Sequence, residues 1–276
     1  MNRRIKILYY WLFKNKAGIK ISELYKFLKK PKVKSIGSRY ITNISYFDDF
    51  IMVSFHRIGD KLYWPRKYNI NNLYQVSAEI FDTNDWHYYE YKTTKVFNDD
   101  IVLDLGAAEG LFSLSIIKRC KKVIIIEPNN LFYHALEKTF RKYIPRKVEL
   151  FKYAVGDKDS VVELSDHSIS SSIIEVEGGN VKMTTLDDLL YNKGRITYIK
   201  ADLEGYEMKM LKGASHIIQD YRPKMAISCY HQENDYRKII NLVKELVPKY
   251  KYHLKGITHY TGKPVMIHFW IPDERN

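Results

Sequence analysis

The segment Ile101–Gly110, which reads IVLDLGAAEG, is an apolar run that ends in a glycine-containing turn. The residues after it, Leu111–Arg119, carry apolar side chains at helical spacing. We therefore predict a buried strand, a tight turn and a helix. Gly106 and Gly110 would let the backbone pass close to a ligand, and the free N–H groups at the start of the helix would point at it.

Apolar runs and amphipathic segments continue to alternate beyond this turn. The predicted strands are 101–105, 122–126, 148–154, 196–201, 224–229, 251–254 and 265–270. The predicted helices are 111–119, 131–143, 185–191, 206–219 and 235–247. Runs such as Val123–Ile126 are typical of parallel strands that are buried on both faces. The sequence thus predicts an α/β fold with a mostly parallel sheet, and its ligands would bind beyond the carboxyl ends of the strands.

Composition and length exclude several classes of protein. The chain has 276 residues, of which 45% are hydrophobic and 28% charged, so disordered and fibrous classes are excluded. The early apolar run Ile7–Phe13 is far shorter than the ~20 residues that span a bilayer, and it is too rich in Tyr and Trp for a secretory signal. The two cysteines, Cys120 and Cys229, form neither a disulfide framework nor a metal cluster, so we expect a cytoplasmic location.

The net charge of +13 is concentrated in residues 1–40, which hold twelve Lys and Arg residues and one acidic residue, Glu23. The rest of the chain is nearly neutral, so we expect no nucleic-acid partner. Within this basic arm, apolar residues recur at helical spacing with Arg3, Arg4, Lys6 and Lys14 beside them. The apolar residues are Ile5, Leu8, Tyr9, Leu12 and Phe13.

Two interpretations of this amphipathic segment stay open. A basic amphipathic helix can lie on an anionic lipid surface, which would make the protein peripheral at the inner membrane surface. The interpretation that we favour is a helix docked on its own domain or on a second subunit. In either case residues 1–34 would form the contact, and residues 1–40 would form a helical arm.

Residues 41–95 predict a small cap of strands and turns before a catalytic domain over residues 96–276. The apolar runs Phe50–Phe55 and Lys61–Trp64 flank Gly59-Asp60, a pattern typical of a hairpin. The aromatic segment Trp86–Tyr91 comes next. We expect most of its rings in a core, although they could also wall a ligand pocket.

The spacing of an acidic residue points to a nucleoside cofactor. Glu127 lies 21 residues after Gly106, ends the second predicted strand and precedes Pro128. A carboxylate at this position accepts hydrogen bonds from both ribose hydroxyls. We therefore expect a nucleoside-containing cofactor at the glycine turn.

The side chains of the turn select among such cofactors. A nicotinamide fingerprint has a second glycine where a pyrophosphate approaches, and Ala108 replaces it here. Asp104 and Glu109 would repel a pyrophosphate and favour a cationic ligand. S-adenosylmethionine combines adenosine, ribose and positive charge, so it is the expected cofactor. A nicotinamide-dependent oxidoreductase remains the enzymatic alternative.

A second group of carboxylates, Asp202, Glu204 and Glu207, lies where a strand is predicted to give way to a helix. Carboxylates pack poorly, so we predict a site there, with Asp202 beside the glycine turn. Glu207 is expected to cap or pair locally within the helix.

These motifs together resemble the FkbM-type family of S-adenosylmethionine-dependent methyltransferases. The resemblance covers about residues 86–270, and its motifs are 104–107, 127–128, 154–157, 185–188, 200–214 and 222–231. It implies a Rossmann-like class I methyltransferase fold, with a seven-stranded, mostly parallel sheet and helices on both faces. It also implies methyl transfer to a hydroxyl of a sugar, glycan or glycolipid-type acceptor.

Motifs and resemblance together give the expected contacts to the methyl donor. These residues are Asp104, Gly106, Ala107, Ala108, Glu109, Gly110, Glu127, Pro128, Ala154, Val155, Asp157 and Asp202. The resemblance implies that the turn over residues 154–157 borders the adenine.

A hydroxyl acceptor must lose a proton, and His231 is the predicted general base because an ordinary histidine pKa near 6.5 suits that role. Asp202 or Glu204 would orient the imidazole or take the proton directly. Alternatively, His231 is a histidine hydrogen-bonded under a loop. A divalent metal held by Asp202, Glu204 and His231 is conceivable, but the spacing does not require it.

A further alternative from a different class is a non-catalytic, membrane-associated scaffold with a methyltransferase-like sheet. The intact carboxylates Asp104, Glu127 and Asp202 at predicted strand ends disfavour it, because a scaffold has no use for charges there.

Overall fold

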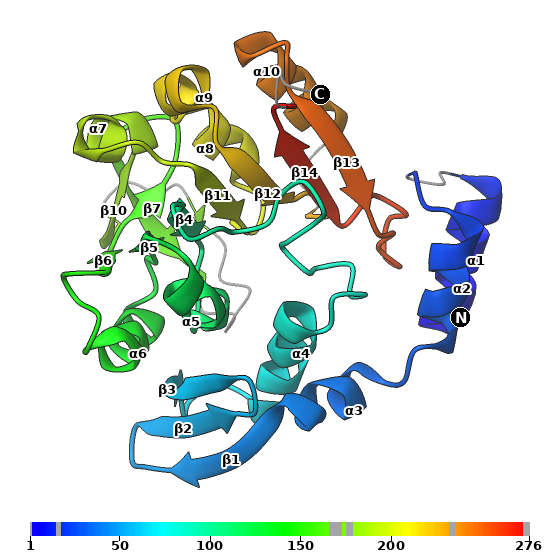
Figure 1. Cartoon of the computed structure of the whole chain (residues 1–276), viewed down its shortest axis with the longest axis horizontal. Coiled ribbons are helices and arrows are strands. Elements are labelled where there is room, and N and C mark those ends of the chain that lie inside the picture. The colour runs from blue at the N-terminus through cyan, green and yellow to red at the C-terminus, as the bar shows by residue number, and fades with distance from the viewer. Residues whose placement is uncertain (1, 15–17, 166–172, 175–178, 232–235, 273–276) are drawn as a thin grey trace.

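The computed structural model describes residues 2–14, 18–165, 173–174, 179–231 and 236–272, and these form an α/β domain with an N-terminal extension (Figure 1). The central sheet has seven strands in the order β13-β14-β12-β11-β4-β5-β6. Strand β14 runs antiparallel to both of its neighbours, and the other pairings are parallel. The predicted fold class is confirmed. The strands are β4 (Ile101–Leu105), β5 (Lys122–Ile126), β6 (Val148–Phe151), β11 (Tyr198–Ala201), β12 (Lys224–Ser228), β13 (Lys251–Lys255) and β14 (Met266–Trp270).

Both faces of the sheet are covered, which explains the continuous apolar runs of its central strands. Val123 and Ile125 of β5 belong to one core cluster, whereas Ile124 and Ile126 belong to the other. Helices α5 (Leu111–Ile116) and α6 (Asn130–Phe140) contribute to the first cluster. The second cluster is closed by α7 (Leu186–Leu190), α8 (Glu207–Lys212), α9 (Ser215–Tyr221) and α10 (Tyr236–Leu246).

A smaller, four-stranded sheet comes after β6 in the chain, with the order β7-β10-β8-β9. Its strands are β7 (Ala154–Val155), β8 (Ser160–Leu164), β9 (Ile173–Ile174) and β10 (Val181–Thr184). The predicted strand over residues 148–154 is therefore divided between two sheets.

The segment that leads into the domain contains the sheet β1 (Ile41–Tyr46), β2 (Phe50–Phe55) and β3 (Ile58–Pro65), followed by helix α4 (Ile70–Phe81). The expected hairpin is present, but its turn is at residues 56–57, because Phe55 pairs with Ile58 and Gly59-Asp60 lies inside β3. The prediction of only strands and turns over residues 41–95 is wrong, since α4 occupies twelve of them. The side chain of Asn69 caps this helix by accepting from the Asn71 N–H.

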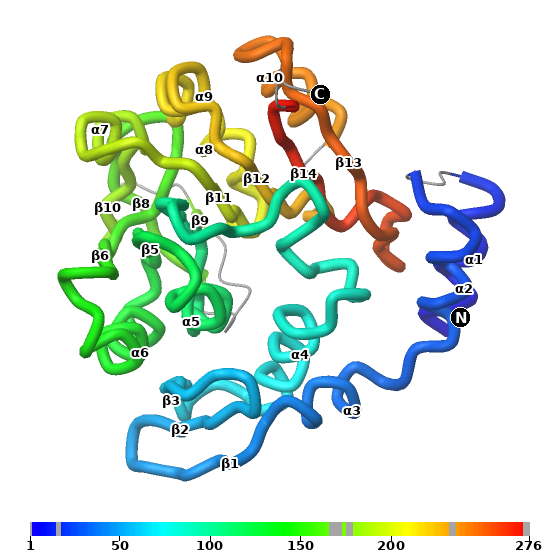
Figure 2. The backbone as a smooth tube through the Cα atoms, viewed as in Figure 1, coloured from blue at the N-terminus to red at the C-terminus, as the bar shows by residue number. Residues whose placement is uncertain are grey.

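The basic arm consists of α1 (Arg3–Phe13), α2 (Ile21–Lys29) and α3 (Val33–Gly37). Figure 2 shows its first two helices at the edge of the molecule, near the turn between β13 and β14. Ile7 and Leu24 are buried in a cluster with Trp86, and the Phe27 and Trp86 rings stack with centroids 3.9 Å apart. The arm therefore packs on its own chain. Among the described residues, no helix is both long and apolar enough to cross a membrane.

Candidate functional site

The predicted glycine turn leaves the carboxyl end of β4 and leads into α5. Gly106 and Gly110 have φ angles of +62° and +79°, a region that favours glycine. A Cβ on Gly106 would lie 2.0 Å from the Asp202 carbonyl oxygen. Gly106 therefore allows β4 and β11 to end against each other, and this brings Asp202 beside the turn as the sequence predicts.

Asp104 is fully buried beneath this turn and lines neither of the two cavities found there. It accepts a hydrogen bond from the Ser113 hydroxyl at 2.6 Å, and its other oxygen lies 3.1 Å from the Lys200 Nζ. Lys200 also donates to the carbonyl oxygen of Gly106 at 2.7 Å. The expected direct contact between Asp104 and the donor stays a prediction. In the structure Asp104 pairs with Lys200, which in turn holds the backbone of the turn.

Lys200 begins the motif over residues 200–214, but no role was predicted for it from the sequence. It lies directly opposite Asp104 in the parallel pairing of β11 and β4. Burial alone would lower the pKa of Lys200, but the charges of Asp104 and Asp202 raise it, so the ammonium group stays charged. Its carboxylate partner comes from another strand, so only the sheet register could have identified it.

Glu127 and Glu109 face the same turn from either side. Glu127 accepts from the N–H groups of Ala108 and Asn129, both at 2.8 Å. Glu109 accepts from the Leu111 N–H at 3.3 Å. Burial raises the pKa of both carboxyl groups to about 7, against the opposing effect of these amides. Each group is thus poised to gain negative charge when a cation or a hydrogen-bond donor arrives.

Two small cavities, of about 110 Å³ and 50 Å³, meet at the turn. Gly106, Ala108, Asp202 and Glu204 line both. The larger one is further lined by Gln75, Val76, Glu79, Ile80, Tyr89, Ala107, Glu109, Phe112, Lys200 and Tyr230. The smaller one is further lined by Glu127, Pro128, Asn129, Phe132, Leu164, Ile173 and Leu203.

Helix α4 contributes four of these wall residues, Gln75, Val76, Glu79 and Ile80, which were not predicted from the sequence. The signal that could have found them is the helical spacing of Leu73, Ile80 and their apolar neighbours, which lies between two strand-like segments. The aromatic segment is divided between roles: Tyr89 lines the cavity, as expected for a pocket wall, and Trp86 lies in the core under the arm.

His231 lies among three carboxylates at the carboxyl ends of β11 and β12. Its Nε2 is 3.1 Å from a Glu204 oxygen and 3.6 Å from an Asp202 oxygen. Its Nδ1 is 3.1 Å from Glu207 Oε1. The Tyr89 hydroxyl donates to the other Asp202 oxygen at 2.8 Å. The structure thus brings together the predicted catalytic residues and adds Tyr89 and Glu207 to them.

The ionisation of His231 differs from the expectation. Burial by itself would lower the pKa of the imidazole, but Glu204, Glu207 and Asp202 together raise it to about 11. A pKa raised this far would leave the imidazole protonated at neutral pH, in contrast to the ordinary pKa expected from the sequence. As a cation, His231 would order the carboxylates, and its expected role as general base stays a prediction.

Glu207 is the buried anchor of this group. It accepts from the N–H groups of Leu203 and Gly205 and from the Ser228 hydroxyl. The predicted local capping role is thus found at the start of α8. Oxygen or nitrogen atoms of Asp202, Glu207 and His231 lie within 4.8 Å of one another, close enough to share a cation. Glu207 therefore has donors from its own chain, whereas Asp202 Oδ1 and His231 Nε2 are buried without a hydrogen-bond partner among the described residues.

The turn over residues 154–157 does not line the cavities at the glycine turn. Ala154 and Val155 are buried in β7, and Asp157 is exposed. Their expected contact with the donor stays a prediction. Pro128 does line the smaller cavity, as expected.

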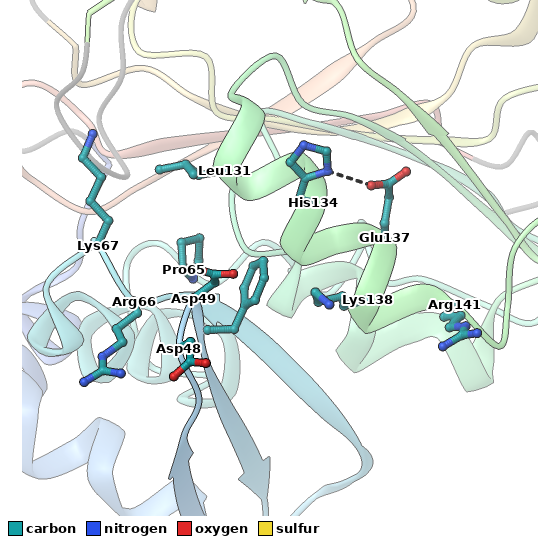
Figure 3. A pocket seen from close by; sticks show the side chains of 11 residues that line it. Asp48, Asp49, Pro65, Arg66, Lys67, Leu131, His134, Glu137, Lys138 and Arg141 are labelled. Atoms are coloured by element: carbon teal, nitrogen blue, oxygen red, sulfur yellow. Dashed lines mark hydrogen bonds and ion pairs between the residues drawn. The ribbon is translucent and has the colours of Figure 1, made fainter.

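A much wider groove of about 960 Å³ lies between β2–β3 and α6 (Figure 3). Its walls are of mixed charge, and His134 and Glu137 of α6 pair across 2.9 Å at its edge. It shares no lining residue with the two cavities at the turn. The volume of a cavity alone therefore does not identify the functional site. The carboxyl ends of the strands and the charged side chains there identify it.

With this geometry established, the comparisons with known proteins identify the family. A profile of the methyltransferase FkbM domain matches residues 104–253, which is more than half of the chain. The chain belongs to the FkbM methyltransferase family. No curated protein sequence matches it at a significant level.

A solved structure shows the same fold at low sequence identity, and other solved structures match with lower TM-scores. An FkbM methyltransferase from Methylobacillus flagellatus is 20% identical with a TM-score of 0.50, and the match covers 71% of this chain and 54% of that one. This chain thus spans about half of that protein. An rRNA methylase from Streptococcus thermophilus is 15% identical, with a TM-score of 0.42 and coverage of 64% and 90%. Trm5b from Pyrococcus abyssi is 13% identical, with a TM-score of 0.45 and coverage of 83% and 62%.

Proposed function

We propose that this methyltransferase uses S-adenosylmethionine to methylate a hydroxyl group of a sugar, glycan or glycolipid headgroup. The observation that carries the proposal is the meeting of two groups of residues at one turn. Glu127 and Glu109 flank the backbone of the turn, and Asp202 and Glu204 line the cavities on both of its sides. A donor bound across the turn would therefore present its methyl group to the carboxylates.

The smaller cavity suits the nucleoside end of the donor. Glu127 is oriented by two backbone amides, so its remaining acceptor capacity is available to ribose hydroxyls. Phe132, Ile173 and Leu203 supply apolar surface for a purine. On the other side of the turn, Glu109 would lie near the sulfonium and amino charges. Contact of Glu127 with the ribose and of Glu109 with the positive charges of the donor would explain why acidic residues surround a nucleoside site.

The larger cavity suits a hydroxyl-rich acceptor. The rings of Tyr89, Phe112 and Tyr230 line it together with the amide of Gln75. Aromatic faces can pack against the C–H surfaces of a sugar ring, and amide and carboxylate groups can bind its hydroxyls. This combination favours a carbohydrate over a flat, apolar acceptor.

Methyl transfer is an in-line displacement in which the acceptor oxygen bonds to the methyl carbon as the carbon–sulfur bond breaks. The protein contributes chiefly alignment and exclusion of water. The hydroxyl proton passes to a carboxylate, Glu204 or Asp202, because the neighbouring imidazole is already protonated. His231 keeps the two carboxylates in place and stays charged throughout.

Calorimetry with S-adenosylmethionine and S-adenosylhomocysteine tests the donor assignment directly. We expect binding to the full chain, a loss of roughly 10–100-fold for Glu127→Ala, and no change for Glu137→Gln, a carboxylate on the exposed face of α6. Acceptors are then sought by mass spectrometry after incubation of cell glycans, glycolipids and nucleic acids with isotopically labelled donor. Label confined to nucleic acid, or no donor binding, would contradict the proposal.

A further inference from the structure

Helix α1 has two apolar faces, and the residues that the structure describes cover only one of them. Ile7 is fully buried, and Tyr10 and Trp11 pack beside it against the core under the arm. The exposed stripe lies on the opposite side and consists of Ile5, Leu8, Tyr9, Leu12 and Phe13. Its members range from 36% exposed at Leu8 to 71% at Phe13.

The exposed stripe runs along the whole helix. At about 100° per residue its five members share one side of α1, and the buried Ile7 lies on the other. The rings of Tyr9 and Phe13 contact each other with centroids 5.4 Å apart, so they present one continuous apolar patch. Contiguous exposed patches of this kind mark contact surfaces, whereas single exposed apolar residues do not.

The charges around the exposed stripe indicate which kind of partner binds it. Arg4 and Lys6 flank it on either side of the helix, about 100° from Ile5 in each direction. The arm as a whole carries twelve basic residues and one acidic residue. A second copy docked through this stripe would bring an identical set of cations against the first. An anionic surface neutralises them instead.

We propose that α1 lies in the headgroup layer of an anionic lipid surface, with the exposed stripe inserted and Arg4 and Lys6 at the lipid phosphates. Such binding is peripheral, since α1 is an eleven-residue helix and basic amphipathic helices lie parallel to the surface. Tyr9 suits this depth because its ring is apolar and its hydroxyl is polar.

The docking of the arm connects this surface to the catalytic cavity. Tyr230 packs against the same cluster that holds Ile7 and Trp86, and it also lines the larger cavity. Binding through α1 would keep that cavity close to the lipid headgroups. This step rests on the proposed function, and it singles out a glycolipid headgroup among the sugar acceptors.

Vesicle flotation with the full chain tests the proposal. We expect the wild-type protein to float with vesicles that contain phosphatidylglycerol, and to bind pure phosphatidylcholine vesicles at least tenfold more weakly. The double variant Leu12→Gln/Phe13→Gln should lose at least tenfold in binding to the anionic vesicles. Lys6→Gln should lose about fivefold. Phe47→Gln, which alters an exposed ring outside the arm, is the matched control and should bind like the wild type.

Two results would overturn the proposal. One is equal binding to both kinds of vesicle, or binding that the double variant leaves unchanged. The other is a doubled mass in solution that the double variant restores to that of a monomer, because a second copy would then cover the stripe. Donor affinity is measured on the same samples without lipid. If the wild-type protein does not bind the donor, the proposed function is contradicted. If it binds the donor but does not float with anionic vesicles, only the proposed lipid contact is contradicted.

Discussion

Lys200 and Asp104 form the ion pair on which the geometry of the glycine turn depends. Both side chains are buried, and Lys200 also donates to the carbonyl oxygens of Leu105 and Gly106. A buried charge that loses its partner retains its desolvation cost. The pair therefore fixes the position of the turn, although neither residue need touch the donor.

We expect Lys200→Met to lower the free energy of unfolding by roughly 3–5 kcal/mol, because it leaves the Asp104 carboxylate buried without its cation. Urea unfolding followed by circular dichroism measures this change. The double variant Lys200→Met/Asp104→Asn should recover part of the loss, since no net charge then remains. A single variant as stable as the wild type would show that the pair does not constrain the turn.

Glu109 and Glu127 should make donor binding depend on pH. Their pKa values of about 7 mean that both groups gain charge as the pH rises through neutrality. A cationic donor binds the charged forms better, so its affinity should rise between pH 6 and pH 8 and binding should release protons. Calorimetry in buffers of different ionisation enthalpy measures the release. Glu109→Gln/Glu127→Gln should abolish it, and an unchanged release would exclude these groups.

The same two groups affect stability in the opposite sense. Their folded pKa values are raised above those of an unfolded carboxyl group, near 4.5. The stability that they contribute is therefore present at low pH and is lost as the pH rises from about 4.5 to about 7. Donor binding offsets this loss, because it favours the charged forms.

His231 should act through position and not as the base. With a pKa of about 11, it does not titrate between pH 6 and pH 9, so the turnover profile should show no histidine limb in that range. His231→Ala should lower turnover by about 10²-fold because Asp202 and Glu204 lose their alignment, with donor affinity retained. A limb near pH 6.5 that disappears in this variant would restore the general-base assignment made from sequence.

At the scale of elements, the packing of α3 on α4 sets one wall of the larger cavity. Gly37 permits this packing, because a Cβ there would lie 1.8 Å from the Tyr74 carbonyl oxygen. Gln75 follows Tyr74 directly in α4 and lines the cavity. The wall is therefore positioned by a contact on the far side of the same helix.

We expect Gly37→Ala to lower the free energy of unfolding by roughly 1–3 kcal/mol through overpacking against this backbone. Gly37 has a helical φ of −61°, so steric displacement is the sole cause. Gly59→Ala is the matched control, since a Cβ there would have an ordinary neighbour at 3.4 Å. Thermal unfolding of both variants gives the comparison, and equal midpoints would contradict the close packing.

At the scale of the whole molecule, the segment before residue 96 is joined to the catalytic domain by a shared core. Leu62, Trp64 and Leu73 belong to the same buried cluster as Phe112 and Phe132 of the main domain. The predicted division at residues 40 and 95 stays a prediction, and residues 41–95 share this buried core with the main domain.

A truncation series should reveal this difference. The fragment 96–276 should fail to unfold cooperatively. It lacks α4 and the three-stranded sheet β1–β3, whose apolar side chains share a buried cluster with Phe112 and Phe132. The fragment 41–276 should retain a cooperative transition, since it loses only the arm. Circular dichroism melts distinguish the two outcomes, and a cooperative melt of the shorter fragment would establish an independent domain.

Local pattern was enough to predict the sheet, the glycine turn and the acidic residue after the second strand, because strand periodicity and turn chemistry act over a few neighbouring residues. The family motifs added the number of strands. The partners of the charged residues could not be predicted in this way. The lysine beside Asp104 is an example: the pairing of β4 with β11 places Lys200 opposite it, and nothing near Asp104 in the sequence indicates this.

Only the tertiary structure decided the remaining features, and they share one physical cause: each depends on groups that are far apart in the chain. The pKa of His231 is raised because carboxylates from another strand end and the following helix surround it. α4 became a cavity wall by packing against the turn. The amphipathic pattern of α1 was visible in the sequence. The sequence did not show which apolar face of α1 is buried, because Trp86, Ile257 and Val265, which pack with Ile7, are far away in the chain.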